Sequence, residues 1–424
     1  MGALPALRAS RANVNAMLRE SGRSDFPGAS RHRLRSGLVV AQLAGSLVLL
    51  ISAGLFARSL WRVQQMYLGF DPDGVLNVTL DPHGIGYDEP RTRSFYRELE
   101  ARVRALPGVK SAALAFYIPM GNFQDQRTVY LEGRPLAKGQ LPPMMMLSRV
   151  DPPYFETMRV PLRRGRGFAE TDNATAPKVA IVNEKMAKQL WPNQDPLGKR
   201  FSIFGPSGPF TQVVGVAQDG KYNLAAFEEP VPFFYLPYAQ DYSSMMTLQI
   251  RSAVPPESLI ATVRQAIHGL APDLPIYDVR TMEQSLAGMN GFFVFRMGAV
   301  LAAAMGLIGL TLAVVGVYGV ASFSAEQRTH EMGIRMAPGA ERSDILRLVL
   351  RQGAVLIAAG VLCGLAAFWA LTRATARLLV GVSATDPLTF SGATVLLAAI
   401  ALWACYVPAR RAMRLDPMAA LRYE

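Results

Sequence analysis

The sequence predicts an α-helical membrane protein with four transmembrane helices and a large α/β extracytoplasmic domain inserted between the first and second helices. Three observations predict this fold class: four long apolar stretches, the distribution of arginine along the chain, and alternating strand-like and helix-like segments between the first two stretches. The composition agrees, because 50% of the 424 residues are hydrophobic and only 18% are charged, which is more apolar than a typical soluble protein.

Four stretches are long and apolar enough to cross a bilayer, which takes about 20 residues. They are residues 38–56, 297–323, 353–372 and 388–407. A signal peptide is the alternative for the first stretch, but the Arg-rich segment 1–37 is much longer than a signal-peptide n-region. No clear cleavage site follows it, so we expect an uncleaved anchor. In the second stretch small residues are spaced for close helix packing, at Ala302, Gly306, Gly309, Ala313 and Gly316.

The placement of arginine predicts the orientation of the chain in the membrane. Arginines cluster in segment 1–37, between the second and third stretches, and after the fourth; four crossings place all three segments in the cytoplasm. Arg373 and Arg377 lie on the opposite side and disagree with this pattern. The expected organisation is a cytoplasmic tail 1–37, helix 38–58, extracytoplasmic domain 59–291, helix 292–323, cytoplasmic coupling loop 324–352, helix 353–378, external loop 379–387, helix 388–408 and cytoplasmic tail 409–424.

The extracytoplasmic segment is predicted to be α/β. Its expected strands lie at 75–80, 112–116, 211–219 and 276–279, its expected helices at 91–105 and 258–270, and a strand turns directly into a helix within 178–190. Strands that alternate with helices favour split βαβ units over a β-sandwich.

No catalytic constellation is present in the sequence. The P-loop pattern is missing, and the nearest Gly-Lys pairs, at 198–199 and 220–221, lack the following hydroxyl. There is no nucleophile elbow, and the four histidines and two cysteines are not spaced as metal ligands. We therefore expect no enzyme activity, no catalytic, cofactor-binding or metal-binding residues, and no cofactor. The net charge of +12 reflects membrane orientation rather than nucleic-acid binding.

Three groups of residues have a functional and a structural interpretation, and the structural one is favoured in each. Asp71 and Asp73 flank a proline and precede a glycine, which is typical of a turn rather than of paired catalytic carboxylates. A solvated strand end, rather than an anion site, is expected for Arg163, Arg164 and Arg166. A buried strand, rather than a flexible ligand surface, is expected for the three methionines 144–146.

The predicted cytoplasmic loop combines mixed charges with apolar residues on a short helix that is broken at Pro338. Such a surface suits a docking partner, and a simple helical connector explains it equally well.

Residues 4–20 resemble residues 407–423, with eight identities at a constant offset of 403. Two basic tails of similar composition or an internal repeat would each produce this match.

Longer segments carry a resemblance to a known family. The stretch EQRTHEMGIRMAPGAERSDILRLVLRQG resembles the FtsX-like permease signature, and the chain as a whole resembles the MacB-like class of ABC permeases. Further segments that carry the resemblance are 154–172, 179–201, 213–222, 384–390 and 408–424. The chain is most similar to duplicated orphan permeases first recognised in acidobacteria, in which residues 4–20 would be the closing tail of a first copy.

The resemblance implies the permease (transmembrane) subunit of an ABC-type export or mechanotransmission system, located in the bacterial inner membrane. Its implied partners are the lipid bilayer, a separate cytoplasmic ABC ATPase, a second permease copy in a homodimer or pseudo-dimer, and a periplasmic adaptor. The implied ATPase-coupling residues are Glu326, Arg328, Glu331, Met332, Gly333, Ile334 and Arg335. The alternative function is an FtsX-like membrane regulator that activates an extracytoplasmic cell-wall hydrolase.

Two residues depart from the family pattern. Pro338 stands where Leu is usual, which predicts a kink in the coupling loop. Arg159 stands where Gly is usual, which puts a tight turn there in question.

Overall fold

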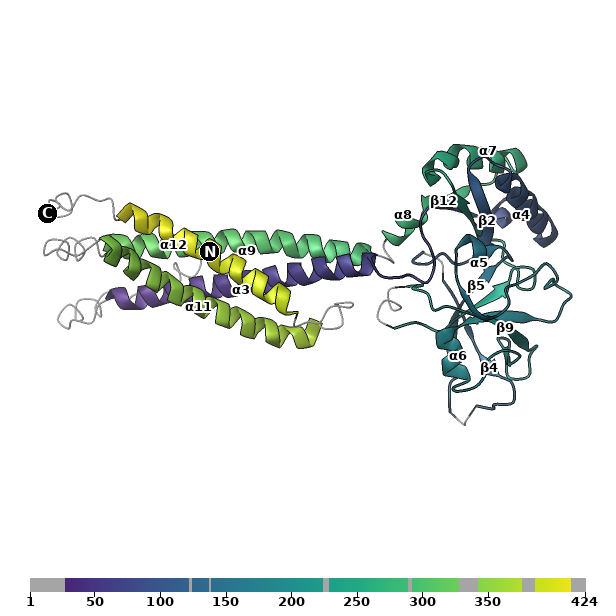
Figure 1. Ribbon diagram of the computed structural model, residues 1–424, viewed down its shortest axis with the longest axis horizontal. Helices are drawn as coiled ribbons and strands as arrows, with labels where there is room; N and C mark the ends of the chain where they lie inside the picture. The colour runs from purple at the N-terminus through teal and green to yellow at the C-terminus, as the bar shows by residue number, and fades with distance from the viewer. Residues whose placement is uncertain are drawn as a thin grey trace, which may run out of the picture. The chain divides into compact units, whose positions relative to one another are not determined.

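The computed structural model describes residues 27–121, 124–136, 139–223, 229–288, 292–327, 342–375 and 386–412. The chain divides into two compact units (Figure 1). One is helical and comprises Met1–Leu55, Val300–Ala376 and Ala384–Glu424. The other is α/β and comprises Phe56–Ala299 with Arg377–Ser383.

Four long helices carry the predicted membrane spans. They are α3 (Pro27–Gln64), α9 (Phe293–Gln327), α11 (Arg342–Thr375) and α12 (Pro387–Ala412). Within them, the stretches that are apolar and long enough to cross a membrane are Leu34–Gln64, Phe293–Phe323, Leu350–Leu371 and Pro387–Arg410. The predicted fold class is therefore confirmed, with one spanning helix before the α/β unit and three after it.

Helix α3 supplies the buried stripe around which the helical unit packs. Leu43, Leu47, Ile51 and Leu55 are spaced by four residues, so they share one helix face, and each is at most 1% exposed. The predicted small residues of α9 face this helix: a Cβ added at Gly309 would lie 3.1 Å from the Ser46 hydroxyl. On α11, a Cβ added at Gly360 would lie only 2.6 Å from Cβ of Leu43. Small residues thus let the helices approach, as their spacing predicted.

The α/β unit is built on one large mixed sheet. Its strand order is β12-β1-β11-β2-β5-β10-β7-β9-β8-β4, with β3 also paired to β5 and β6 to β9. The strands are β1 (Val75–Leu80), β2 (Val109–Ala115), β3 (Asp125–Thr128), β4 (Tyr130–Leu131), β5 (Met144–Val150), β6 (Leu162–Gly165), β7 (Val179–Asn183), β8 (Arg200–Ser202), β9 (Thr211–Ala217), β10 (Phe233–Pro237), β11 (Met246–Ser252) and β12 (Ile276–Thr281). The helices are α4 (Glu89–Arg104), α5 (Tyr154–Thr157), α6 (Glu184–Leu190), α7 (Ile260–Leu270) and α8 (Met282–Leu286).

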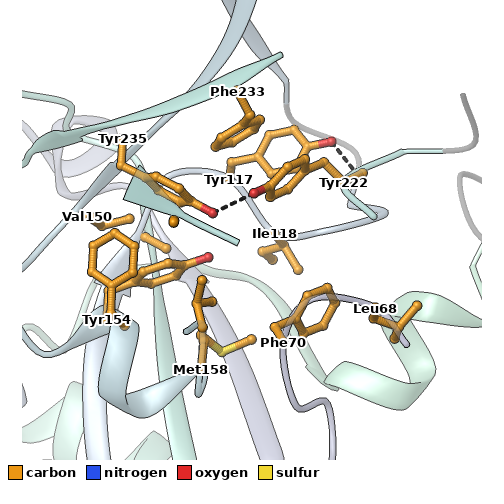
Figure 2. Close-up of a cluster of buried hydrophobic side chains, with 14 of the residues drawn as sticks. Leu68, Phe70, Tyr117, Ile118, Val150, Tyr154, Met158, Tyr222, Phe233 and Tyr235 are labelled. Atoms are coloured by element: carbon orange, nitrogen blue, oxygen red, sulfur yellow. Dashed lines mark hydrogen bonds between the residues drawn. The ribbon is translucent and has the colours of Figure 1, made fainter. Parts of the chain in front are cut away.

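The two halves of this sheet meet at a narrow seam. Strands β2 and β5 are antiparallel and share a single register pair, Ala115 with Val150. On either side the halves are well paired, and separate apolar cores lie under α4 with α7 and under α6. A third core, the aromatic core, joins the two halves and contains Tyr117, Tyr154, Tyr222, Phe233 and Tyr235 (Figure 2). The Tyr222 and Phe233 rings stack with centroids 3.9 Å apart, and the Tyr222 and Tyr235 hydroxyls hydrogen-bond at 2.8 Å.

The expected strands and helices are found, with small shifts in their ends. Helix α4 begins at Glu89, two residues before the predicted start, because the Asp88 carboxylate accepts a hydrogen bond from the Arg91 amide. The turn questioned at Arg159 is present. The amide of Arg159 donates to Glu156 O and that of Val160 donates to Phe155 O, which is the usual Schellman ending of a helix. Arg159 therefore has the left-handed φ of 52° that glycine normally supplies.

Candidate functional site

The residues expected to contact an ATPase fall mainly outside the described part of the chain. Glu326 lies in the last turn of α9. Those outside the described residues are Arg328, Glu331, Met332, Gly333, Ile334 and Arg335, together with Pro338, segment 4–20 and residues 413–423 of the similar segment 407–423. Docking at this loop and the internal repeat therefore stay predictions.

The ends of two spanning helices are built into the aromatic core of the α/β unit. Val63, near the end of α3, is 0% exposed, and Phe295, in the first turn of α9, is 5% exposed. Both belong to the aromatic core. Leu68 and Phe70 of the linker, residues 65–74, which connects α3 to β1, pack in the same core (Figure 2). A displacement of either helix end must therefore disturb packed side chains of the domain, because protein interiors transmit strain.

Arg251 of β11 clamps the linker to the sheet. Its side chain is 6% exposed, and its guanidinium donates to Asp71 O and Asp73 O, both at 2.8 Å, and to Thr157 O at the end of α5. Arg159 adds an ion pair to the Asp71 carboxylate at 2.6 Å. The buried cation thus joins three separate elements through backbone carbonyls, which gives the linker one fixed path.

The turn predicted at Asp71 and Asp73 is confirmed by its hydrogen bonding. The Asp73 amide donates to the Asp71 carboxylate at 3.0 Å, and Gly74 has a left-handed φ of 66°. The Asp71 carboxylate is in addition a partner of the arginine clamp, a role that the local pattern does not reveal.

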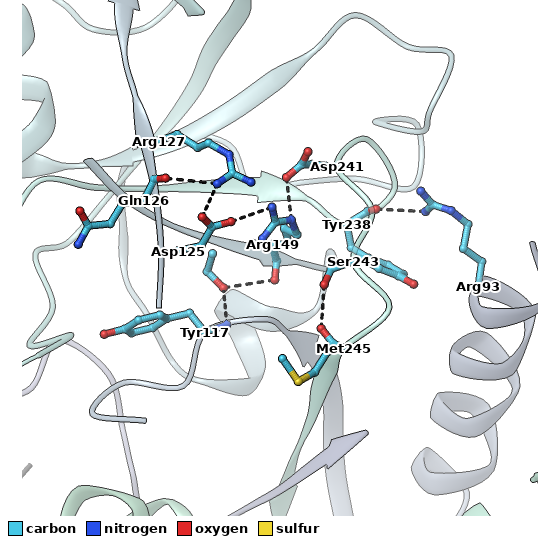
Figure 3. Close-up of polar contacts among 11 residues, drawn as sticks. Arg93, Tyr117, Asp125, Gln126, Arg127, Arg149, Tyr238, Asp241, Ser243 and Met245 are labelled. Carbon is cyan, nitrogen blue, oxygen red and sulfur yellow. Dashed lines mark hydrogen bonds and ion pairs between the residues drawn. The ribbon is translucent and has the colours of Figure 1, made fainter. Parts of the chain in front are cut away.

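A second buried arginine lies next to the seam, on the β5 side. Arg149, 7% exposed, forms ion pairs with Asp125 of β3 at 2.9 Å and with Asp241, in the loop after β10, at 2.7 Å (Figure 3). Its guanidinium carbon also lies 4.9 Å from the centre of the Phe116 ring. Two carboxylates compensate one buried cation, so the connection holds β3, β5 and the β10 loop together.

The two arginines of β6 and Arg166, which directly follows the strand, are found at a solvated strand end, as predicted. Arg163 hydrogen-bonds Gln218, Arg164 pairs with Asp195 at 2.7 Å, and Arg166 pairs with Asp172 at 2.6 Å. Hydrogen bonding from Arg166 lowers the pKa of Asp172. The buried strand predicted for the methionines is β5, where Met145 and Met146 are buried while Met144 is 64% exposed.

Metal-ligating clusters are not found in the part of the chain that the structure describes: no three His, Cys, Asp or Glu side chains there are grouped to hold an ion. The described residues show three structural features: buried helix ends, a linker held by Arg251, and a buried Arg149 with two ion pairs.

Comparison with known families identifies this arrangement. The family model for the MacB-like periplasmic core domain matches residues 37–267, more than half of the chain. The chain belongs to the MacB-like family. A second model, the FtsX-like permease C-terminal region, matches residues 303–417 of this MacB-like chain, which contain most of α9 and all of α11 and α12. The duplicated-permease subgroup is not distinguished by these matches.

Curated relatives of the MacB-like chain are ABC transporter proteins. It is 29% identical over 285 residues to the pyoverdine export ATP-binding/permease protein PvdT of Pseudomonas syringae pv. tomato, covering 62% of this chain and 40% of that protein. It is 28% identical to the uncharacterized ABC transporter permease YknZ of Bacillus subtilis, and the match covers 64% of this chain and 68% of that protein. It is 24% identical to the macrolide export ATP-binding/permease protein MacB of a Shewanella species, and the match covers 93% of this chain and 59% of that protein. The chain thus spans about two fifths of the length of PvdT.

The alignment with a solved structure, the periplasmic region of MacB from Actinobacillus actinomycetemcomitans, covers 51% of this chain and 92% of that chain. The two are 13% identical in sequence and the TM-score is 0.35. The four spans and the MacB-like domain make the chain a multi-pass inner-membrane protein with an extracytoplasmic domain.

Proposed function

We propose that this chain is the permease subunit of an ABC-type export or mechanotransmission system, and that it couples a separate cytoplasmic ATPase to motion of its extracytoplasmic domain. One observation carries the proposal: Val63 of α3 and Phe295 of α9 are buried in the core of a MacB-like domain. The matching relatives are named as export or ABC permease proteins, and an FtsX-like region supplies the other spans. The chain has no P-loop of its own, so nucleotide binding falls to the partner.

The proposed coupling surface is the loop between the second and third spans, with Glu326, Arg328, Glu331, Met332, Gly333, Ile334 and Arg335. A second permease copy, in a homodimer or in a pseudo-dimer of the duplicated type, would supply the other half of the ATPase-binding surface, and a periplasmic adaptor would meet the domain. In this proposal the ATPase displaces the loop between the second and third spans, and the spanning helices move with it. The linker, residues 65–74, which Arg251 holds against the sheet, then moves the extracytoplasmic domain.

Co-reconstitution tests the proposal. The full chain in nanodiscs is mixed with the ABC ATPase that co-purifies with it from its native membrane, and ATPase binding and stimulation are measured. Glu331→Lys and Arg335→Glu are expected to weaken binding about 5- to 100-fold, since each reverses a charge in a partly desolvated contact. Pro338→Leu is expected to couple as well as wild type or better, because a helical path through the loop becomes available.

Arg164→Glu is the matched control. It reverses an arginine that is exposed on β6 of the extracytoplasmic domain, paired with Asp195. ATPase binding by this variant should equal that of wild type. If the two loop reversals bind and stimulate like Arg164→Glu, the loop is a connector and coupling through it is wrong.

A further inference from the structure

A cleft opens where the two halves of the sheet diverge. Beyond the pair of Ala115 and Val150, the Asp151 amide still donates to Leu114 O at 3.2 Å, and after this bond β2 and β5 separate. A cavity of about 350 Å³ fills the space, between α4 and the loops that follow β5, β6 and β10. Small-molecule sites typically measure about 300–1,000 Å³ and often lie at the carboxyl ends of parallel strands, as β5 and β10 are here.

Most charges in this cleft are already paired. Helix α4 presents Arg93, Arg97, Glu100 and Arg104 on one face, because they are spaced by four, three and four residues. Arg104 pairs with Glu100 and Arg93 with Glu89, both at 2.8 Å. On the facing wall, Asp172 is neutralised by Arg166. Arg97 and Glu170 are exposed at the rim, where solvent screens them. The acidic group without a cation at hydrogen-bond distance in the depth of the cleft is Asp151.

Apart from the adjacent Glu100 carboxyl, which can share a proton with Asp151, two buried polar side chains of the cleft lack a hydrogen-bond partner among the described residues. They are the carboxyl group of Asp151, whose side chain is 9% exposed, and the hydroxyl of Tyr238, a residue that is 8% exposed. Arg104 approaches Asp151 to 3.8 Å, which is an ion-pair distance but too long for a hydrogen bond. Tyr238 lies beside Arg93, which donates to its carbonyl at 3.1 Å (Figure 3). Unsatisfied buried groups are rare in folded proteins, and each calls for an explanation.

A shared proton explains how the cleft is stable on its own. Burial raises the pKa of Asp151 well above its ordinary value, and the adjacent Glu100 carboxyl raises it further; burial also raises the pKa of Glu100. Two adjacent buried carboxylates do not both ionise readily, so the pair holds one proton. The other titratable or charged groups that line the cleft are Arg93, Tyr96, Arg97 and Arg104 from α4, Glu170 and Asp172 after β6, and Tyr238 after β10.

We propose that this cleft binds a protonated aliphatic amine, with its ammonium group between the carboxylates of Asp151 and Glu100 and the hydroxyl of Tyr238. An ammonium offers three donors and no acceptor, which complements a set of oxygen acceptors. An anion is disfavoured, because Arg93 and Arg104 already have carboxylate partners. Pro152, Pro153 and Pro237 supply apolar wall for the alkyl part. When the ammonium binds, the carboxyl pair releases its proton to solvent, so one cation replaces another and charge is conserved.

This inference goes beyond the proposed coupling function, because equilibrium binding by the extracytoplasmic domain needs neither an ATPase nor ATP. Failure of one proposal therefore leaves the other standing.

Calorimetry on the full chain in nanodiscs tests the inference, with putrescine and n-butylamine as probes and butan-1-ol and butyrate as neutral and anionic controls. Saturable binding of both amines is expected, and neither control should bind. Titration in two buffers of different ionisation enthalpy should reveal release of up to one proton per amine.

Three variants localise the site. Asp151→Asn is expected to weaken amine binding about 10- to 100-fold, since it removes a charge-assisted hydrogen bond. It should still fold, because asparagine resembles the protonated acid in shape. Tyr238→Phe should weaken binding about 2- to 10-fold. The matched control Glu170→Gln removes an exposed carboxylate from the same cleft and should change affinity less than about twofold.

The inference is overturned if neither amine binds at millimolar concentration, if butyrate binds in preference to the amines, or if Asp151→Asn binds putrescine like wild type. Should Asp151→Asn not accumulate, the pH dependence of the wild-type protein decides. Protons compete with the ammonium, so affinity should fall as the pH is lowered from about 8 to about 5. An amine affinity that stays constant over this pH range would also overturn the inference.

Discussion

A single residue with an unfavourable backbone conformation ends α5. Arg159 has φ 52°, and a left-handed conformation costs a residue with a side chain about 1–2 kcal/mol relative to glycine. It persists because two backbone hydrogen bonds fix the turn and the guanidinium pairs with Asp71. We expect Arg159→Ala, which loses the pair and keeps the conformation, to be less stable than Arg159→Gly by about 1 kcal/mol. This corresponds to about 2–4 °C in the thermal unfolding midpoint of a domain of this size.

Unfolding of the full chain in detergent, followed by tryptophan fluorescence, to which the buried Trp191 of this domain contributes, provides the measurement. Arg164→Ala is the control, since Arg164 also forms an exposed ion pair but has no left-handed φ. Equal midpoints for Arg159→Ala and Arg159→Gly would show that the turn stores no strain.

The protonation of Asp151 links the stability of the domain to pH. Its pKa is raised above the ordinary value of 3.8 by burial, so between these two values the folded state binds more protons than the unfolded chain. Folding stability therefore falls as the pH rises from about 4 through the raised pKa. Asp151→Asn removes this dependence. We expect its unfolding midpoint, relative to wild type, to increase with pH, as measured by thermal unfolding of both proteins at a series of pH values from about 4 to about 8. If the difference between the two midpoints does not change with pH, the raised pKa of Asp151 does not contribute to the stability of the domain.

At the scale of elements, close helix packing in the membrane unit depends on glycine. A Cβ at Gly360 of α11 would meet Cβ of Leu43 at 2.6 Å, and an atom bonded directly to the α3 backbone cannot move aside alone. We expect Gly360→Ala to destabilise the helical unit by about 1–3 kcal/mol, as overpacking does in other cores. Gly319→Ala is the matched control on α9, because nothing lies within 4 Å of the added carbon. The readout is the thermal unfolding midpoint in nanodiscs, and equal midpoints for the two variants would argue against tight packing at Gly360.

The elements differ in how much of them could be predicted from the sequence. Strand β1 has the predicted ends because an apolar-rich run with the β-branched residues Val75, Val78 and Thr79 lies between turn residues. Strand β11 was not predicted, although all seven of its residues are buried, because Gln249 and Arg251 interrupt its apolar pattern. Those polar side chains are compensated by distant partners, Asn77 and the linker carbonyls, which only the folded chain brings near. Polar residues buried through long-range contacts cannot be recognised from local pattern.

The same limit applies to the sites. The spanning helices could be predicted because apolarity over about 20 residues is a local property. The arginine clamp and the amine cleft could not, because they unite residues far apart in the sequence. Asp151 meets Glu100 only because β2 and β5 pair over such a short distance before they diverge. Asp71, interpreted from sequence as part of a turn, proves to be that and an ion-pair partner as well.

For the molecule as a whole, the decisive property is which side of the membrane each segment faces. Arginine-rich segments resist translocation, and four spans are found in the part of the chain that the structure describes, so we predict that 324–352 and both termini lie on the cytoplasmic side. We replace Cys363 and Cys405, the two native cysteines, by Ala and introduce one cysteine at a time. Asp273→Cys, at an exposed turn after α7, should react with a membrane-impermeant maleimide in intact spheroplasts. Ala340→Cys, in the coupling loop, should react only after the membrane is permeabilised. The cysteine-free chain controls for background, and equal labelling of the two positions in intact spheroplasts would rule out this topology, and with it a cytoplasmic ATPase at the loop.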